Sequence, residues 1–143
     1  MIKKFLFPEN TYGTGVSIVL LVLRIAFAGL LVMHGWQKLT HFEATAQQFA
    51  SMGMGGTVAA ALSVFAEFFC ALGVVVGLLY RLALIPMIIN MSVAFFIADG
   101  ARLTGEHSGE LAFLYLVVFV ALIITGSGKY ALDNFLFNGK KQK

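Results

Sequence analysis

The feature that most constrains this chain is a series of long apolar runs with almost no charged residues inside them. A helix needs about 20 residues to cross about 30 Å of hydrocarbon, and each run has that length or comes close to it. Backbone amides cannot stay unpaired in lipid, and the runs lack the alternation typical of a membrane β-barrel. The composition agrees, with 59% hydrophobic and 12% charged residues. We therefore expect an all-α membrane protein, a four-transmembrane-helix bundle in a single domain over residues 1–143, with spans at about 17–36, 57–79, 82–98 and 110–125.

The basic residues indicate how such a bundle is oriented. If four spans alternate, most lysines and arginines fall on one side, and the more positive side of a membrane protein faces the cytoplasm. That side would hold Lys3, Lys4, Arg81, Lys129, Lys140, Lys141 and Lys143, against Lys38 and Arg102 on the other. The bias predicts a multi-pass protein of the cytoplasmic (inner) membrane with both termini in the cytoplasm. Basic residues at the lipid headgroups also account for the net charge of +3, so the expected partner is the lipid bilayer and no nucleic-acid partner is needed.

The loop after the first span carries the pattern of a short helix. Thr40 and Glu43 have the Thr-x-x-Glu spacing of a capping box, and apolar residues then recur at helical intervals until Gly53. Glycine after the last periodic residue is a common helix stop. We expect a short amphipathic helix over about 40–52 that lies on the outer membrane surface between spans one and two.

Arg24 and Glu67 are charged residues placed well inside predicted spans. A charge near the middle of a bilayer costs from about 3 to above about 10 kcal/mol, so each needs a partner. We expect the two to pair, because their expected depths differ by no more than an arginine side chain can reach. Two interpretations stay open. The pair could fix the packing of spans one and two, or Glu67, influenced by Arg24, could carry a proton or hydrogen-bond a substrate.

One face of the first span continues this polar character. At about 100° per residue, His34 and Lys38 share a face with Arg24 and would point into the outer end of the bundle. Gly35 between them permits a close approach of another helix, and Trp36 suits the interfacial aromatic belt. The alternative is that Lys38 extends to the headgroups and His34 is structural. If both side chains border a cavity leading to Glu67, this face is the mouth of a site.

Other polar residues complete the set of candidates. Asn90 in the third span should face protein, where an amide usually bridges helices. The histidines His34, His41 and His107 match no metal-ligand spacing, so no metal site is predicted. The single cysteine, Cys70, excludes an internal disulfide and a CxxC motif within one chain.

In its order of features the chain resembles the DoxX family of small four-helix membrane proteins. The resemblance covers nearly the whole chain. It is carried by Leu23-Arg24, Phe27-Ala28-Gly29, His34-Gly35-x-x-Lys38, Phe49, Gly53, Glu67, Gly73-x-x-x-Gly77-Leu78, Arg81, Gly109-Glu110-Leu111 and the closing pattern Gly126-Ser127-Gly128-Lys129-Tyr130-Ala131-Leu132-Asp133. The resemblance implies a membrane oxidoreductase component, since the family is named after a quinone-reactive subunit of a thiosulfate-oxidising complex. The usual Gly-Pro-Gly near the end reads Gly126-Ser127-Gly128 here, and there is no cysteine pair, which weakens the sulfur assignment.

The family and the residues together predict a quinone- or sulfur-linked redox subunit that acts with a redox enzyme partner. No covalently bound cofactor is expected, whereas quinone is a candidate ligand, and whether the chain is itself an enzyme stays open. Glu67 and His34 would be catalytic, and Arg24, Lys38 and Asn90 would bind substrate. Two alternatives are a transport component gated by the Arg24–Glu67 pair, and a non-catalytic scaffold whose glycines Gly29, Gly73 and Gly77 serve helix contacts. The transport alternative would require oligomerisation, and a homo-oligomer is a candidate assembly for the chain in general.

Overall fold

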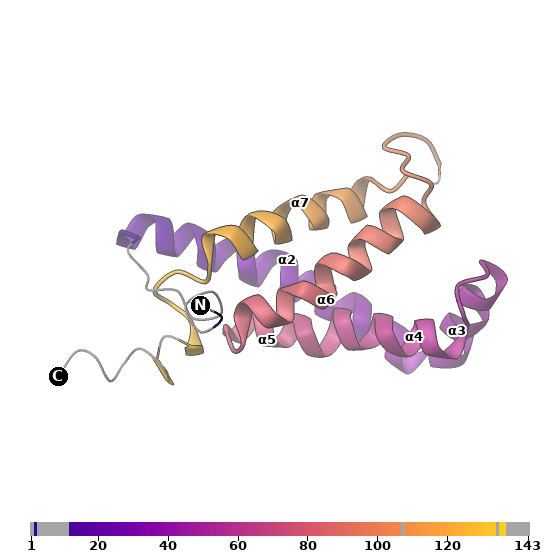
Figure 1. Cartoon of the computed structure of the whole chain (residues 1–143), viewed down its shortest axis with the longest axis horizontal. Coiled ribbons are helices and arrows are strands. Elements are labelled where there is room, and N and C mark those ends of the chain that lie inside the picture. The colour runs from indigo at the N-terminus through magenta and orange to yellow at the C-terminus, as the bar shows by residue number, and fades with distance from the viewer. Residues whose placement is uncertain (1, 3–11, 107, 134, 137–143) are drawn as a thin grey trace.

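The structure is a computed structural model that describes residues 2, 12–106, 108–133 and 135–136, and every regular element in these residues is helical. The first predicted span is one long helix, and the second and third each contain a π-helical stretch. The elements are α2 (Thr14–Thr40), α3 (Phe42–Ser51), α4 (Thr57–Val64), η1 (Phe65–Cys70), α5 (Ala71–Val76), α6 (Tyr80–Val93), η2 (Ala94–Ala98) and α7 (Glu110–Thr125). They form a bundle of long, roughly antiparallel rods (Figure 1).

Within the described residues, three helical stretches are long and apolar enough to cross a membrane: Thr14–Thr40, Thr57–Val76 and Tyr80–Ala98. The fourth predicted span is an apolar helix of 16 residues, α7. At about 1.5 Å per residue this is about 24 Å, less than the usual hydrocarbon thickness. The helical membrane bundle is therefore supported, while a fourth full crossing and the orientation of the termini stay predictions.

The two ends of the bundle differ in what covers them. At one end, called here the loop end, lie α3 and the connection between η2 and α7 (Figure 1). At the opposite end, the closing end, residues 126–133 form a closing segment that packs beside the start of α2. Its Lys129 amide donates to Ser17 Oγ at 3.3 Å. The lysines at positions 3, 4, 140, 141 and 143, on which the predicted orientation partly depends, lie outside the described residues.

Apolar side chains fill the middle of the bundle. Leu84, Met87 and Phe119 are fully buried, and Ala28 and Leu31 pack with them from α2. Large apolar side chains also cover the outside, for example Val22 and Ile89 at about 60% exposure. An exterior this apolar suits lipid and not water, because chains in water rarely expose such extended apolar surface.

The turn between α5 and α6 is set by Gly77. Its φ of +78° is open to glycine without strain, and the Leu78 amide donates back to the Gly73 carbonyl at 2.8 Å. A side chain at Gly77 would also place its Cβ 2.6 Å from Ala131 Cβ in the closing segment. The third span, expected from about residue 82, starts earlier, because Tyr80 already begins α6.

The predicted surface helix is present as α3, with a different start. Because α2 continues through Thr40, the Thr40 hydroxyl donates to the carbonyls of Trp36 and Gln37 in the last turn of α2. The predicted capping box was therefore wrong, and α3 begins after His41 with no side-chain cap. The predicted stop at Gly53 is confirmed by its φ of +75° and by the Met54 amide, which donates to the Phe49 carbonyl.

Candidate functional site

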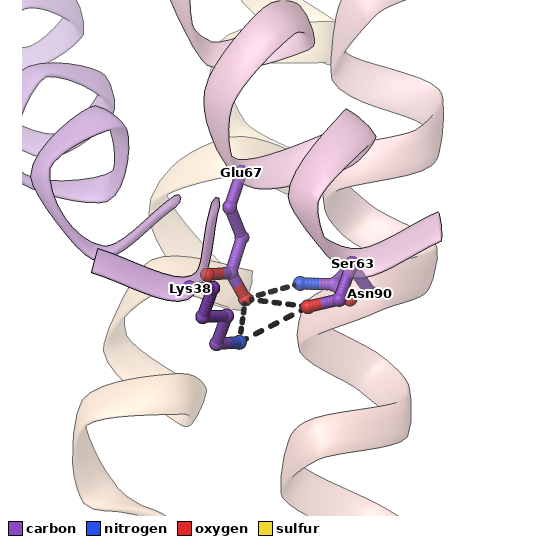
Figure 2. A network of polar contacts seen from close by, with 4 residues as sticks. All are labelled: Lys38, Ser63, Glu67 and Asn90. Carbon is purple, nitrogen blue, oxygen red and sulfur yellow. Dashed lines mark hydrogen bonds and ion pairs between the residues drawn. The ribbon is translucent and has the colours of Figure 1, made fainter. Parts of the chain in front are cut away.

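The site is organised around one oxygen of a buried carboxylate. Glu67 Oε1 accepts hydrogen bonds from Lys38 Nζ at 2.6 Å, Asn90 Nδ2 at 2.7 Å and Ser63 Oγ at 3.2 Å. Lys38 Nζ also donates to Ser63 Oγ at 3.0 Å. Figure 2 shows the side chains of Lys38, Ser63 and Asn90 converging on this oxygen. The set, called here the Glu67 network, ties α2 and α6 to the helix that contains α4 and η1.

Local sequence explains how these side chains meet. Ser63 and Glu67 are four residues apart, at the end of α4 and inside η1, so they lie on one face of the same rod. The π-helical stretch widens the turn that carries Glu67, a feature often found at functional sites. On the facing helix, a Cβ at Gly35 would lie 2.7 Å from the backbone carbon of Glu67. The close approach predicted at Gly35 is confirmed, and it brings Lys38 within reach of the carboxylate.

The carboxylate is almost removed from solvent, with 3% of Glu67 exposed. Such a charge is costly unless it is paired and hydrogen-bonded, and here an ammonium and two further donors share one oxygen. The second oxygen, Oε2, is buried and has no hydrogen-bond partner among the described residues. In Figure 2 it turns away from Ser63 and Asn90. An unsatisfied acceptor of this kind costs about 1–3 kcal/mol, which a bound proton donor would recover.

A polar cavity of about 280 Å³ lies on one side of the Glu67 network. Glu67, Lys38 and His34 contribute to its wall, so the end of the first span borders a cavity that reaches Glu67. The His34 ring stands at 88° to the ring of Tyr115, with ring centroids 6.5 Å apart. The other polar lining residues, Asp99 and Ser108, come from the loop end.

A larger groove of about 770 Å³ lies between α3, α4 and α6. Its polar side chains, among the described residues of its wall, are Ser63 and Asn90, and the rest of the wall is apolar. Both polar residues donate to Glu67 Oε1, so the bridging role expected of Asn90 is confirmed. The Glu67 network therefore separates a polar cavity from an apolar groove and contributes side chains to both.

Arg24 lies elsewhere, and the predicted Arg24–Glu67 pair was wrong. Its guanidinium donates to the backbone carbonyls of Ser127, at 3.3 Å, and of Tyr130. Glu67 is level with Gly35, which is about 16 Å from Arg24 along α2 at about 1.5 Å per residue. The estimate of depth failed because the two helices are offset along their axes. Glu67, in the middle of its rod, lies level with Gly35 near the end of α2 and not with the middle of α2. Arg24 is thus part of the closing end and not of the cavity.

Asp133 is an important residue that sequence reasoning did not single out. Its carboxylate oxygens accept hydrogen bonds from the amides of Leu79, at 2.8 Å, and Tyr80, at 2.9 Å. These amides begin α6, where the helix leaves its first donors unpaired and favours a negative charge. No local signal could reveal this cap, because its partners are more than 50 residues away. Its place at the end of the closing pattern was the one available indication.

No group of three or more metal-ligating side chains that could hold an ion occurs in the part of the chain that the structure describes. His41 is near Thr40 and the Gln37 carbonyl at the surface, away from the cavity. His107 lies outside the described residues. Cys70 is buried as a free thiol.

Comparison with known proteins decides the family. The DoxX family profile matches residues 19–100, which include most of α2, and all of α3, the Glu67 network and α6. The chain belongs to the DoxX family. A Bacillus subtilis protein with the name "Putative oxidoreductase CatD" is 32% identical over 127 residues, which cover 85% of this chain and 89% of that protein. An uncharacterized protein of Haemophilus influenzae is 29% identical over 123 residues, or 80% of this chain and 88% of that protein. No solved structure gives a significant match to this DoxX protein.

Proposed function

We propose that this DoxX protein is a quinol-binding subunit of a membrane redox system, in which the Glu67 network accepts protons and a partner redox protein takes electrons. One observation carries the proposal: a single carboxylate oxygen accepts hydrogen bonds from side chains that line an apolar groove and from one that lines a polar cavity. The name of the Bacillus relative gives general support for a redox role.

The groove has the character of a site for a lipid-soluble ring compound. Binding sites for such molecules are mostly apolar, have volumes of about 300–1,000 Å³ and carry a few polar groups that fix orientation. Here the polar groups are the Asn90 amide and the Ser63 hydroxyl, which suit the oxygens of a quinone or quinol. The apolar wall, including Leu62 and Ile89, is exposed on the outside of the bundle and therefore faces lipid. A long apolar tail could enter there without crossing water.

The chemistry requires separate routes for protons and electrons. Oxidation of a quinol to a quinone releases two electrons and the two hydroxyl protons. A hydroxyl next to Asn90 or Ser63 is one hydrogen bond away from the Glu67 carboxylate, which can accept a proton and pass it toward His34. Lys38 Nζ donates to the same carboxylate oxygen and stays beside the acceptor. The two electrons pass to the partner redox protein, so this chain supplies binding and proton transfer.

The transport alternative loses its gate in this structure. It placed the gate at Arg24 and Glu67, and these residues lie about 16 Å apart along the bundle with different partners. The sulfur-linked alternative has no thiol at the Glu67 network, since Cys70 lines a different apolar surface. Quinol binding is therefore the function that fits the Glu67 network best.

The test compares two tryptophan variants on the same exposed face of α4. Leu62 lines the groove, whereas Val58, one turn earlier and equally exposed at 67% against 64%, does not. In lipid nanodiscs, Leu62→Trp should weaken binding of an isoprenoid-tailed quinone by about tenfold, and Val58→Trp should change it by less than about twofold. Equal effects of the two variants, or no binding to the unmodified protein, would overturn the proposal.

A further inference from the structure

We propose that the polar cavity is a one-sided proton path that opens at the loop end, with Asp99 as the proton-transfer residue between Glu67 and the aqueous phase. The inference rests on the proposed function, because quinol oxidation supplies the protons. Its basis is the arrangement of titratable side chains around one cavity and the apolar packing beneath it.

The cavity wall joins the buried carboxylate to the end of the bundle. Glu67 and Lys38 stand at its inner side, and Asp99 and Ser108 come from the connection that covers the loop end. His34 is exposed at the same cavity. Oε2 of Glu67, which no described residue contacts by a hydrogen bond, is the acceptor available to a water or hydroxyl in this space. The titratable groups that line the path are therefore Glu67, Lys38, His34, Tyr115 and Asp99.

Asp99 is held in place by the backbone around it. It follows η2, and its amide donates to the Ala94 carbonyl at 2.9 Å. A side chain on Gly109 would place its Cβ 2.8 Å from Asp99 Cβ and 3.0 Å from Oδ2, so this glycine allows the carboxylate to lie against the start of α7. A helix start favours a negative charge. The half-buried Asp99 thus has a fixed position between the cavity and the surface.

The opposite direction is closed by apolar packing. Leu31, Met87 and Phe119, each at most 2% exposed, lie between the cavity and the closing end. Beyond them Arg24 places a buried positive charge beside the Tyr80 ring, with 5.9 Å between its guanidinium carbon and the ring centroid. A cation there repels protons, and the apolar layer offers no acceptor among its described side chains. Protons that reach Glu67 therefore leave through the loop end.

The orientation gives this path a consequence for energy conversion. The positive-inside bias predicts that the loop end faces outward. Each quinol that becomes a quinone would then release its two protons outside, while its two electrons pass to the partner redox protein. Quinol oxidation at this site would contribute to a proton gradient across the membrane.

Cysteine labelling tests the path without any quinone. In a Cys70→Ala background, Ala112→Cys points into the cavity, and Leu114→Cys on the same helix is exposed but does not line it. A membrane-impermeant maleimide added outside intact cells should label Ala112→Cys at least about tenfold faster than Leu114→Cys. Ser108→Cys at the cavity mouth serves as the accessible reference. Equal rates at 112 and 114, or labelling at 112 from the cytoplasmic side alone, would overturn the path.

A proton-release measurement tests Asp99. With a tailed quinol bound in nanodiscs, two ferricyanide ions take its two electrons, and a pH dye follows the two protons. Asp99→Asn should slow proton release by at least about tenfold and leave quinone affinity unchanged. Glu106→Gln, an exposed carboxylate of the same connection that does not line the cavity, is the matched control.

The outcomes separate the two proposals. Equal proton-release rates for Asp99→Asn and Glu106→Gln, with intact quinone affinity, would overturn the role of Asp99. If the unmodified protein bound no quinol, the proposed function would be overturned and the path would lose its source of protons. The labelling result would then still show whether the cavity opens to water.

Discussion

Two buried charges lie about 16 Å apart along this bundle, and they are satisfied in different ways. Arg24 at the closing end is 2% exposed and donates to two backbone carbonyls. Glu67 toward the loop end is 3% exposed and accepts from three side chains beside a cavity. Backbone partners cannot change without unfolding the segment that carries them, whereas side chains can exchange partners. Burial alone therefore does not distinguish the two charges, whereas the nature of their partners does, and it makes Glu67 the candidate for a functional role.

The largest effect should follow from breaking the Lys38–Glu67 ion pair. Lys38→Met leaves Glu67 buried without its ammonium, and loss of one partner of a buried pair costs about 3–5 kcal/mol. Chemical unfolding in mixed micelles would measure this. The double variant Lys38→Met with Glu67→Met removes both charges and should recover most of the loss, while no recovery would mean that Lys38 acts mainly through packing.

A somewhat smaller effect is expected at the other end, and it sharpens the contrast between the two charges. Arg24→Met leaves the Ser127 and Tyr130 carbonyls without their donor, which should lower the free energy of unfolding by about 2–4 kcal/mol. Tailed-quinone affinity of the folded fraction should stay the same, because Arg24 contacts neither cavity nor groove. A loss of affinity equal to that expected for Leu62→Trp would contradict the structural role of Arg24.

The cap at the closing end should matter less. Asp133→Ala removes the acceptors for the Leu79 and Tyr80 amides, and loss of a helix N-cap costs about 0.5–2 kcal/mol. Unfolding measurements should find Asp133→Asn closer to the unmodified protein, because an amide oxygen still accepts one bond. Equal stability of the alanine and asparagine variants would show that the contact is not an effective cap.

The smallest effect is expected at Ser63, where stability and binding can be compared in one variant. Ser63→Ala removes one of three donors to Glu67 and should cost about 1 kcal/mol. Because Ser63 also lines the groove, tailed-quinone affinity should fall severalfold, unlike that of Arg24→Met. A change in stability without any change in affinity would show that the quinone ring does not contact Ser63.

Much of the bundle could be predicted from the sequence, because apolar runs and the residues that begin or end helices are local signals. The fourth apolar helix begins and ends as expected, at Glu110 and Thr125, and the second begins at Thr57. Helical periodicity placed His34 and Lys38 on one face, and that face does border the cavity. The close approach at Gly35 was also readable, because no other residue has so small a side chain.

The pairing of charges could not be predicted in the same way. It depends on how far each helix slides against its neighbour, and here Glu67 lies level with Gly35 near the end of α2. Two π-helical stretches then change the register in η1 and η2, for which the sequence has no simple signature. Glu67 therefore meets Lys38 and not Arg24. Contacts of the closing segment were beyond reach for another reason, since they join residues far apart in the chain.

The cap on α6 has a consequence for how the protein is made. Translation delivers the α5–α6 hairpin to the membrane well before Asp133, which follows Leu79 by 54 residues, has left the ribosome. During that interval the first amides of α6 have no carboxylate partner. Arg24 likewise lacks the Ser127 and Tyr130 carbonyls, which belong to the same closing segment. The last part of the chain to be synthesised thus completes helices that were inserted first. A nascent chain that stops short of Asp133 would have its spans in the bilayer without the hydrogen bonds that the closing segment makes to α6. The unpaired amides at the start of α6 would then be a defect that membrane quality-control proteases could recognise.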